Sequence, residues 1–307
     1  MELYDNPAMA SGTLDVGDAS LAWSVHGNGP VAAIGLHGGP GGGRVRGLPR
    51  RFDPSRYRLL NFDQRGCGQS TPHAGDWDTT IDGITTDAMV ADIEAFRVHF
   101  GVERWVVWGG SWGGTLALAY AVRHPERVAG MVLVSPTLLR PSDVAWFTEG
   151  ARRFLPEAWS RFAAAVPPAA NLAAAYDAVV NGHPDLEARR NAVTQWLAWE
   201  AALVAHEGPS GEMPERDAIA FVRLVTRVFA NAAWRGEDEL LAGVRRLAGI
   251  PCTVVHGRLD LSGPPQMAFQ LADAWPGCEL HVVPEGHRGG PLMEARMRDA
   301  IERLETA

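Results

Sequence analysis

The sequence predicts an α/β fold in which a mostly parallel sheet carries helices on both faces and is interrupted by an all-helical insertion. Short apolar segments that read as strands alternate with helical segments up to residue 138 and again after residue 247. Such alternation is typical of parallel strands joined by right-handed crossovers. Between the two stretches strand signals vanish, and Ala and Trp become frequent. We therefore expect an α/β core from residues 1–138 and 248–307, and a helical domain from residues 139–247.

Each expected element rests on its own apolar pattern. The first five strands are nearly continuous apolar runs, which indicates that they are covered on both faces. All seven predicted strands are residues 21–27, 31–38, 57–63, 105–110, 131–135, 252–257 and 279–284. Residues 82–101 and 111–126 carry apolar residues at helical spacing, and further helices are expected near 264–275 and from residue 291.

Composition and charge exclude several classes of function. The chain has 307 residues and a formal net charge of −8, and all 28 of its basic residues are arginine. An acidic chain is a poor partner for a phosphate backbone, because that affinity comes from clustered basic residues. The absence of lysine excludes a pyridoxal Schiff base, a Ser–Lys dyad and a P-loop lysine. Nucleic acid is therefore not an expected partner.

The cysteines and the N-terminal segment favour a cytoplasmic protein. Cys67, Cys252 and Cys278 are widely spaced, so neither a zinc site nor a structural disulfide is expected. The first twenty residues lack the basic and apolar regions of a signal peptide. No apolar run approaches the ~20 residues that cross a bilayer. We expect a cytoplasmic monomer that uses no cofactor or metal and does not bind a membrane.

The sharpest local motif is Gly109-Gly110-Ser111-Trp112-Gly113, which lies between a predicted strand and a predicted helix. A GxSxG turn in this context is a nucleophile elbow, whose small residues permit the strained backbone that exposes the serine hydroxyl. Glycine-rich turns between strand and helix also occur for structural reasons alone. The context favours Ser111 as a nucleophile.

A serine nucleophile needs a general base and a carboxylate that orients the base. Asp260 follows the strand 252–257, and His287 follows the strand 279–284. Both therefore lie at carboxyl ends of parallel strands, where open α/β sheets bind ligands. Their order after the serine also agrees with the elbow. We predict Ser111, Asp260 and His287 as catalytic residues.

A glycine-rich segment follows the strand 31–38. Residues 37–43 read HGGPGGG, so backbone amides there can approach an oxyanion closely, and the residue after the nucleophile supplies a second amide. We assign the oxyanion hole to the backbone N–H groups of Gly39 and Trp112. Phosphate binding is excluded by the absence of GK[ST] and of a GxGxxG that opens a helix.

These motifs resemble the prolyl aminopeptidase (proline iminopeptidase) family of α/β-hydrolases over essentially the whole chain. The resemblance is carried by HGGPGGG, DQRGCGQS (63–70), GGSWGG (109–114), HGRLD (256–260) and the Gly-His pair at 286–287. It implies the same triad and oxyanion donors, and a helical cap whose acidic residues bind the free amine of the substrate. One of these is a glutamate after a tryptophan, which resembles Trp199-Glu200 here. Phe229, and more loosely Trp146 and Phe147, match aromatic residues of the family's substrate pocket.

The neighbours of Glu200 in the sequence also suggest a role for it. On a helix it shares a face with Trp196, Trp199 and Leu203. A carboxylate on an aromatic face is costly to bury unless a cation meets it. It either reaches water at the edge of that face or binds a substrate ammonium, and we favour the ammonium.

The chain departs from the family in one segment. The family's second amine-binding glutamate lies in a sequence of the form R-I-E-x-H-Y-F, and the matching residues 223–229 here read RLVTRVF. Val225 stands in the glutamate position, and Arg227 is expected to bring a positive charge nearby. This departure puts the preference for proline in doubt, but not the hydrolytic machinery.

The sequence thus predicts a serine hydrolase that cleaves the amide bond of an N-terminal aminoacyl group through an acyl-enzyme. Its substrate would be a small peptide or an aminoacyl amide. Two alternatives stay open: an aminoacyl-amide hydrolase or esterase that acts on a small metabolite with the same triad, and a catalytically silent binding module. The silent module is disfavoured because every triad and oxyanion position is present.

Overall fold

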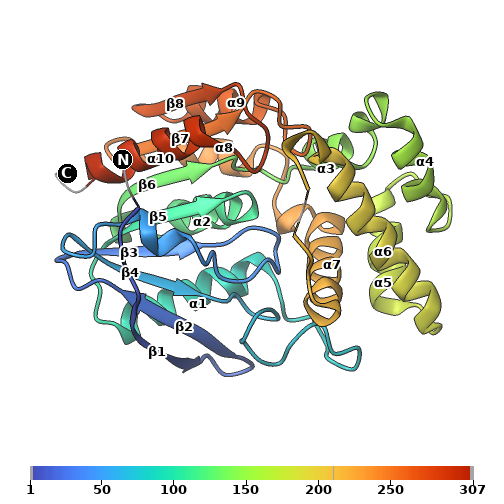
Figure 1. Cartoon of the computed structure of the whole chain (residues 1–307), viewed down its shortest axis with the longest axis horizontal. Helices are drawn as coiled ribbons and strands as arrows, with labels where there is room; N and C mark the ends of the chain where they lie inside the picture. The colour runs from blue at the N-terminus through green and yellow to red at the C-terminus, as the bar shows by residue number, and fades with distance from the viewer. Residues whose placement is uncertain (1–2, 210, 305–307) are drawn as a thin grey trace.

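A computed structural model describes residues 3–209 and 211–304 of the chain. The predicted core and helical domain also include residues 1–2, 210 and 305–307, which lie outside the described residues. Its centre is an eight-stranded sheet with the order β1-β2-β4-β3-β5-β6-β7-β8 (Figure 1). Strands β3 to β8 run parallel to one another, and β1 and β2 are antiparallel to their neighbours. The predicted α/β fold with a mostly parallel sheet is confirmed.

The strands are β1 (Ala8–Asp15), β2 (Ser20–His26), β3 (Val31–Leu36), β4 (Tyr57–Phe62), β5 (Trp105–Gly110), β6 (Val128–Val134), β7 (Cys252–Gly257) and β8 (Cys278–Val283). All seven predicted strands are present. Strand β1 is not among the predicted strands, because of its position in the sheet. It is an edge strand with almost every residue exposed, so it carries no apolar pattern and is held by its ladder with β2.

Helices cover both faces of the sheet. One face packs against α1 (Thr86–His99), α2 (Trp112–Arg123) and α9 (Gln266–Ala274), whose buried residues share one core with the central strands. The other face packs against α10 (Pro291–Leu304), with Met297, Ile301 and Leu304 contributing to a second core. Buried apolar area of this kind contributes most of the stability of such a layered fold.

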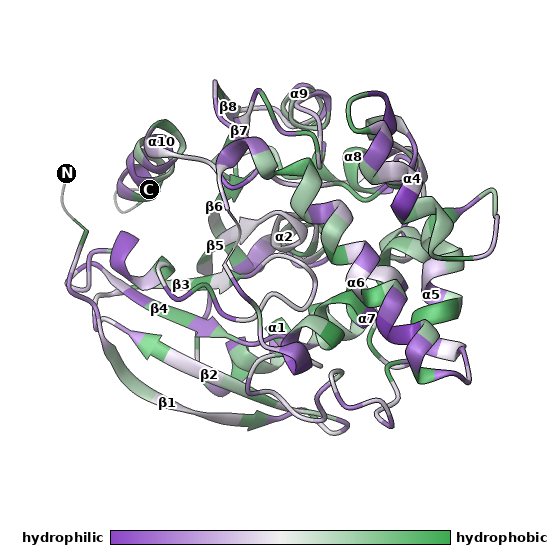
Figure 2. Cartoon of the chain, turned by 45° about the vertical axis from the view of Figure 1, so that its right-hand side comes forward, coloured by the Kyte–Doolittle hydropathy of each residue, from purple (hydrophilic) through white to green (hydrophobic). Residues whose placement is uncertain are grey.

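A second group of helices lies beyond the carboxyl ends of the strands (Figure 1). It comprises α3 (Pro141–Thr148), α4 (Pro156–Ala164), α5 (Leu172–Gly182), α6 (Leu186–Leu203) and α7 (Glu215–Ala230). We call these five helices the cap. They carry both hydrophobic and hydrophilic residues (Figure 2), as amphipathic helices around a shared core do. Their core is aromatic, with Phe162, Tyr176, Trp196 and Trp199 fully buried.

The helix α8 (Glu239–Val244) lies within the segment predicted as the helical domain but packs on α2 and α9. Gly243 permits this approach, because a Cβ there would lie 2.7 Å from the Val122 side chain. The predicted domain boundaries themselves stay a prediction. Short 3₁₀ helices complete the structure: η1 (Leu48–Arg51), η2 (Pro125–Arg127), η3 (Gly150–Arg153), η4 (Ala205–Glu207) and η5 (Ala232–Trp234).

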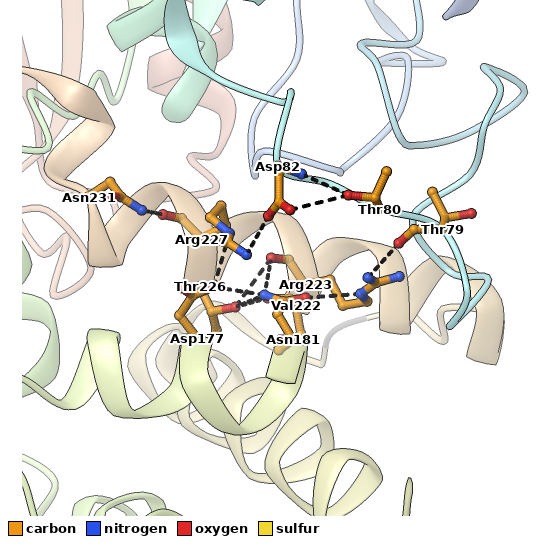
Figure 3. A network of polar contacts seen from close by, with 10 residues as sticks. All are labelled: Thr79, Thr80, Asp82, Asp177, Asn181, Val222, Arg223, Thr226, Arg227 and Asn231. Carbon is orange, nitrogen blue, oxygen red and sulfur yellow. Dashed lines mark hydrogen bonds and ion pairs between the residues drawn. The ribbon is translucent and has the colours of Figure 1, made fainter. Parts of the chain in front are cut away.

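Two arginines on α7 join the cap to the core (Figure 3). Arg223 is 3% exposed and donates to the carbonyl oxygens of Ala74, Asp76 and Thr79 in the loop before α1. Burial lowers the pKa of Arg223 to about 10, so it stays charged at neutral pH. Arg227 pairs with Asp82 of the same loop and with Asp177 of α5. Helix α7 is therefore fixed against this loop by the buried hydrogen bonds of Arg223 and by the partly exposed ion pairs of Arg227.

The strand order places a crevice above β3 and β5. From β3 the chain moves outward to β4, then returns to the other side of β3 as β5 and continues to β6. Ligands in open α/β sheets bind at such a reversal of strand order, outside the carboxyl ends of the strands. The loops after β3 and β5 carry the predicted oxyanion glycines and Ser111. No helix in the described residues is long and apolar enough to cross a membrane.

Candidate active site

Ser111 lies in a sharp turn between β5 and α2. Its φ and ψ angles are 55° and −123°, a conformation that L-residues rarely adopt and that the surrounding chain must enforce. Its neighbours have no room for a side chain: a Cβ on Gly109 would lie 2.4 Å from the Gly113 carbonyl oxygen, and one on Gly113 would lie 2.0 Å from the Leu36 carbonyl oxygen. The GxSxG glycines are therefore required sterically, and the turn has the geometry of a nucleophile elbow.

The structure brings the three predicted catalytic side chains together. Nε2 of His287 lies 3.0 Å from Oγ of Ser111, and Nδ1 of His287 lies 2.7 Å from Oδ2 of Asp260. The other oxygen of Asp260 accepts the backbone amides of Ser262 and Gly263 at 2.9 Å each. Since the carboxylate accepts from Nδ1–H, Nε2 is free to accept the serine proton.

The electrostatics of the pair keep Asp260 ionised. Burial on its own raises the pKa of the Asp260 carboxyl, but the attraction and hydrogen bond of His287 outweigh it, and the pKa is lowered. Burial on its own lowers the pKa of His287, but Asp260, with Glu207 and Glu200, raises it on balance. The imidazolium that forms during proton transfer is therefore stabilised.

Gln64 connects the glycine loop that carries Gly39 with the start of α2, where Trp112 lies. Trp112 is the first residue of α2, so its amide has no acceptor within the helix. The indole of Trp112 donates to Gln64 Oε1 at 2.8 Å, and Gln64 Nε2 donates to the His37 carbonyl oxygen at 2.9 Å. Gln64 is almost fully buried. It therefore fixes the glycine loop relative to the elbow, a role that the sequence analysis did not assign within DQRGCGQS.

A cavity of about 570 Å³ opens above Ser111 and His287 and extends under the cap. Its walls are mainly apolar, and Glu200 of α6 is the acidic side chain that lines it. Trp196 is fully buried and donates from Nε1 to Glu200 Oε1 at 2.7 Å. Burial raises the pKa of Glu200 to about 7, against the opposing effects of this hydrogen bond and of His287. Among the described residues that line the cavity, Glu200 is thus the one carboxylate, and it lies beside Ser111 and His287.

The predicted pocket aromatics divide into two groups. Phe147 and Phe229 line the cavity and pack on Trp196, with ring centroids 5.6 and 5.8 Å from it. Trp146 is not brought to the cavity, and its prediction as a substrate-binding residue does not hold in this structure. Its indole donates to the Leu261 carbonyl oxygen at 2.9 Å, and its ring lies beside that of Phe154, with the centroids 6.4 Å apart.

Val225 lies on the stripe of α7 that includes Phe221 and Phe229, but it is 1% exposed and does not line the cavity. Arg227 also lies outside the cavity lining. Its guanidinium pairs with Asp82 and Asp177, on the side of α7 shown in Figure 3. The expectation that Arg227 brings positive charge to the substrate site is therefore wrong, because two carboxylates hold it elsewhere.

The chain matches known proteins along most of its length. A family model described as "alpha/beta hydrolase fold" matches residues 34–289. A proline iminopeptidase of Xylella fastidiosa is 42% identical over 270 residues, covering 82% of each chain. One of Neisseria meningitidis is 40% identical over 95% of each chain. The chain belongs to the proline iminopeptidase family of α/β-hydrolases. Membership makes it a hydrolase, as the sequence analysis predicted.

Solved structures agree on the fold. The structure titled "Crystal structure of VinJ" is 19% identical to this chain, with a TM-score of 0.67. The match covers 98% of this chain and 99% of that one. Proline iminopeptidase of Mycobacterium smegmatis has a TM-score of 0.60 at 20% identity, with 97% and 99% covered. The predicted α/β-hydrolase fold is confirmed.

Two further residues of the site escaped sequence analysis. His256, at the end of β7, is fully buried. Its Nε2 donates to the Gly263 carbonyl oxygen and lies 3.5 Å from Oδ2 of Asp260. Glu207, in η4, accepts the backbone amide of His287. Glu207 belongs to no local motif, because it contacts His287 across 80 residues of sequence. His256 is the first residue of HGRLD, and its contacts with Asp260 and Gly263 are local. Among the described residues no group of three or more His, Cys, Asp or Glu side chains is arranged to hold a metal ion.

Proposed function

We propose that the protein is an exopeptidase that removes an N-terminal aminoacyl residue from a small peptide or an aminoacyl amide. One observation carries the proposal: Glu200 lines the same cavity as Ser111 and His287. A carboxylate in a mainly apolar cavity is a suitable partner for an ammonium group. The substrate's free amine binds Glu200, so that only a terminal residue places its carbonyl carbon at Ser111.

The triad then carries out acyl transfer. His287 Nε2 takes the hydroxyl proton while Oγ of Ser111 bonds to the carbonyl carbon, and the amides of Gly39 and Trp112 stabilise the oxyanion. His287 returns the proton to the leaving nitrogen as the C–N bond breaks. Water, deprotonated by His287, then attacks the acyl-enzyme and releases the amino acid. Each step uses only groups of this chain and the substrate.

Proline is the proposed terminal residue, because the curated relatives bear the name proline iminopeptidase at 40–42% identity. The second candidate function is hydrolysis of other aminoacyl amides or esters of small metabolites. Val225 favours that candidate, since the carboxylate that the family carries in this position is missing. A cytoplasmic location and a monomeric assembly stay predictions, and nucleic acid and membranes are not proposed as partners.

The test is a panel of aminoacyl naphthylamides, each prepared with a free and with a blocked α-amine, with Ser111→Ala as the inactive control. The proposal expects release of naphthylamine from the free-amine compounds only, with prolyl naphthylamide among the best. Equal turnover of blocked and free compounds would establish a general acyl hydrolase. Turnover by Ser111→Ala would contradict the mechanism.

A further inference from the structure

The loop that carries His287 is held by a residue that follows the cap helix α6. Oε1 of Glu207 accepts the backbone amide of His287 at 2.9 Å, and Oε2 accepts the backbone amide of Arg288 at 2.8 Å. The carboxylate is seated directly on this backbone: a Cβ added to Gly286 would lie 2.3 Å from the carboxyl carbon of Glu207. Both oxygens are thus used to orient the histidine loop.

Arg288, the residue after His287, in turn binds the segment that carries Glu207. The guanidinium of Arg288 donates to the carbonyl oxygens of Val204 at 3.1 Å, Gly208 at 2.6 Å and Pro209 at 3.1 Å. These carbonyls lie on the same segment as Glu207, directly after the end of α6 at Leu203. Each segment therefore fixes the other: Glu207 binds the backbone of the His287 loop, and Arg288 of that loop binds the backbone of the segment after α6.

We propose that Glu207 is a positioning residue for His287, and that together with Arg288 it couples the substrate-binding helix of the cap to the catalytic base. The inference rests on the Ser111–His287 pair of the proposed function, but not on the identity of the substrate. Glu200 lies in the last turn of α6, and the segment that follows this helix fixes His287. Movement of the cap helix therefore shifts the ammonium site and the base together.

Geometry and charge both give Glu207 an effect on catalysis. A carboxylate that accepts two successive amides fixes the direction of the loop, and a displacement of 1 Å at a catalytic group is able to cost about a hundred-fold in rate. Its charge also favours the imidazolium form of His287. The other titratable or charged groups around His287 are Asp260 and His256 from the β7 region, Glu200 from α6 and the adjacent Arg288.

The experiment measures how fast a fluorophosphonate modifies Ser111 over a range of pH. In this reaction Oγ bonds to phosphorus, fluoride leaves and His287 takes the hydroxyl proton, so no substrate needs to be known. The variants are Glu207→Gln, which keeps one acceptor and removes the charge, and Glu207→Ala, which removes both. Glu285→Gln is the matched control, because Glu285 lies in the same loop but accepts the amides that begin α10.

We expect labelling to slow roughly ten-fold in Glu207→Gln and roughly a hundred-fold in Glu207→Ala, measured per folded molecule. The acid midpoint of the labelling rate should move down by roughly 0.5–1 pH unit in both. Glu285→Gln should lower thermal stability and leave the midpoint in place.

An unchanged labelling rate and an unchanged acid midpoint in Glu207→Gln would overturn the proposal. A loss of labelling that only follows the fraction of folded protein would overturn it as well. Should Glu207→Ala fail to fold, Glu207→Gln decides the question. A wild-type protein that is labelled but cleaves no aminoacyl amide would refute the proposed substrate alone.

Discussion

The indole of Trp196 donates a hydrogen bond of 2.7 Å to the carboxylate of Glu200, one helical turn further along α6. Trp196 is fully buried beneath the aromatic residues that line the cavity, so the carboxylate is held in place before any substrate arrives. Holding it there costs free energy, since burial favours its neutral form. The same surroundings thus fix the position of the Glu200 carboxylate, the proposed amine-binding group, and destabilise its charged form.

Glu200→Gln should lower kcat/KM by roughly ten- to a hundred-fold for substrates with a free amine. A charge-assisted hydrogen bond is worth about 1.5–3 kcal/mol, and glutamine removes the charge while its carbonyl oxygen still accepts from Trp196. For N-blocked substrates or plain acyl esters the loss should be small. Steady-state kinetics on one blocked and one unblocked substrate measure this difference. Equal losses on both would make Glu200 a structural residue.

The same variant should be more stable than the wild type at alkaline pH. The pKa of Glu200 is raised from 4.5 to about 7, so ionisation is less favourable in the folded state than in the unfolded chain. This cost is absent below the unfolded value and complete above pH 7. Glu200→Gln should therefore gain ~1–3 kcal/mol in the free energy of unfolding at pH 8 and little at pH 4. Denaturant titrations at the two pH values test the sign, and an equal effect at both would contradict it.

The acid limb of kcat/KM should be steeper for free-amine substrates than for blocked ones. As the pH falls, Glu200 takes up a proton near pH 7, and His287, whose pKa is raised above its ordinary value, is protonated as well. A free-amine substrate needs both groups deprotonated. The slope of log kcat/KM against pH should therefore approach about 2, against about 1 for a blocked ester that needs only His287. Substrates with a free amine should also lose activity above about pH 8, as the ammonium itself is lost. Parallel profiles for the two substrate types would exclude Glu200 from amine binding.

Sequence alone could predict the elements that create local patterns. The elbow around Ser111 is visible because steric limits on its backbone demand glycine at fixed positions. Seven strands are visible because they contain apolar runs. In β2 to β7 most of the residues are buried, whereas β8 is mostly half-buried. The edge strand β1 is not visible, since its exposed residues carry no periodicity.

Contacts across long separations are equally invisible in one sequence. Glu207 meets His287 from 80 residues away, and Gln64 links two loops whose relative position only the sheet determines. Arg227 lies two residues after Val225, and residues two apart on a helix do not face the same side. Its partners Asp82 and Asp177 come from other segments, which one sequence does not reveal. Sequence reasoning predicted three side chains that the structure brings together, and the structure adds the residues that contact them.

Asp260→Asn should leave a folded protein with most of its activity lost. An asparagine keeps the size of the side chain, but its amide can place N–H against Nδ1 of His287 and so favour the wrong tautomer. We expect a loss of roughly 10³–10⁴ in kcat with KM nearly unchanged. A thermal unfolding curve close to that of the wild type provides the control. A KM effect larger than the kcat effect would point to a role in substrate binding instead.

Val225→Glu tests whether the family's second carboxylate can simply be restored. Val225 is 1% exposed and packs in the core between cap and sheet, and the structure places Arg227 on Asp82 and Asp177, where it cannot neutralise a new charge. An unpaired carboxylate in such a position costs several kcal/mol, so the variant should lose roughly 2–5 kcal/mol in the free energy of unfolding at pH 8. Val225→Gln is the matched control, because it has the same length and no charge.

The difference between the two variants isolates the charge from the added volume. Lowering the pH to about 5 should bring Val225→Glu close to Val225→Gln, because a buried carboxyl takes up a proton under those conditions. Denaturant titrations of both variants at pH 5 and pH 8 measure this convergence. If instead Val225→Glu is as stable as Val225→Gln at pH 8 and turns over prolyl naphthylamide faster than the wild type, the new side chain reaches the cavity beside Glu200. The missing carboxylate would then be a determinant of specificity that a single substitution restores.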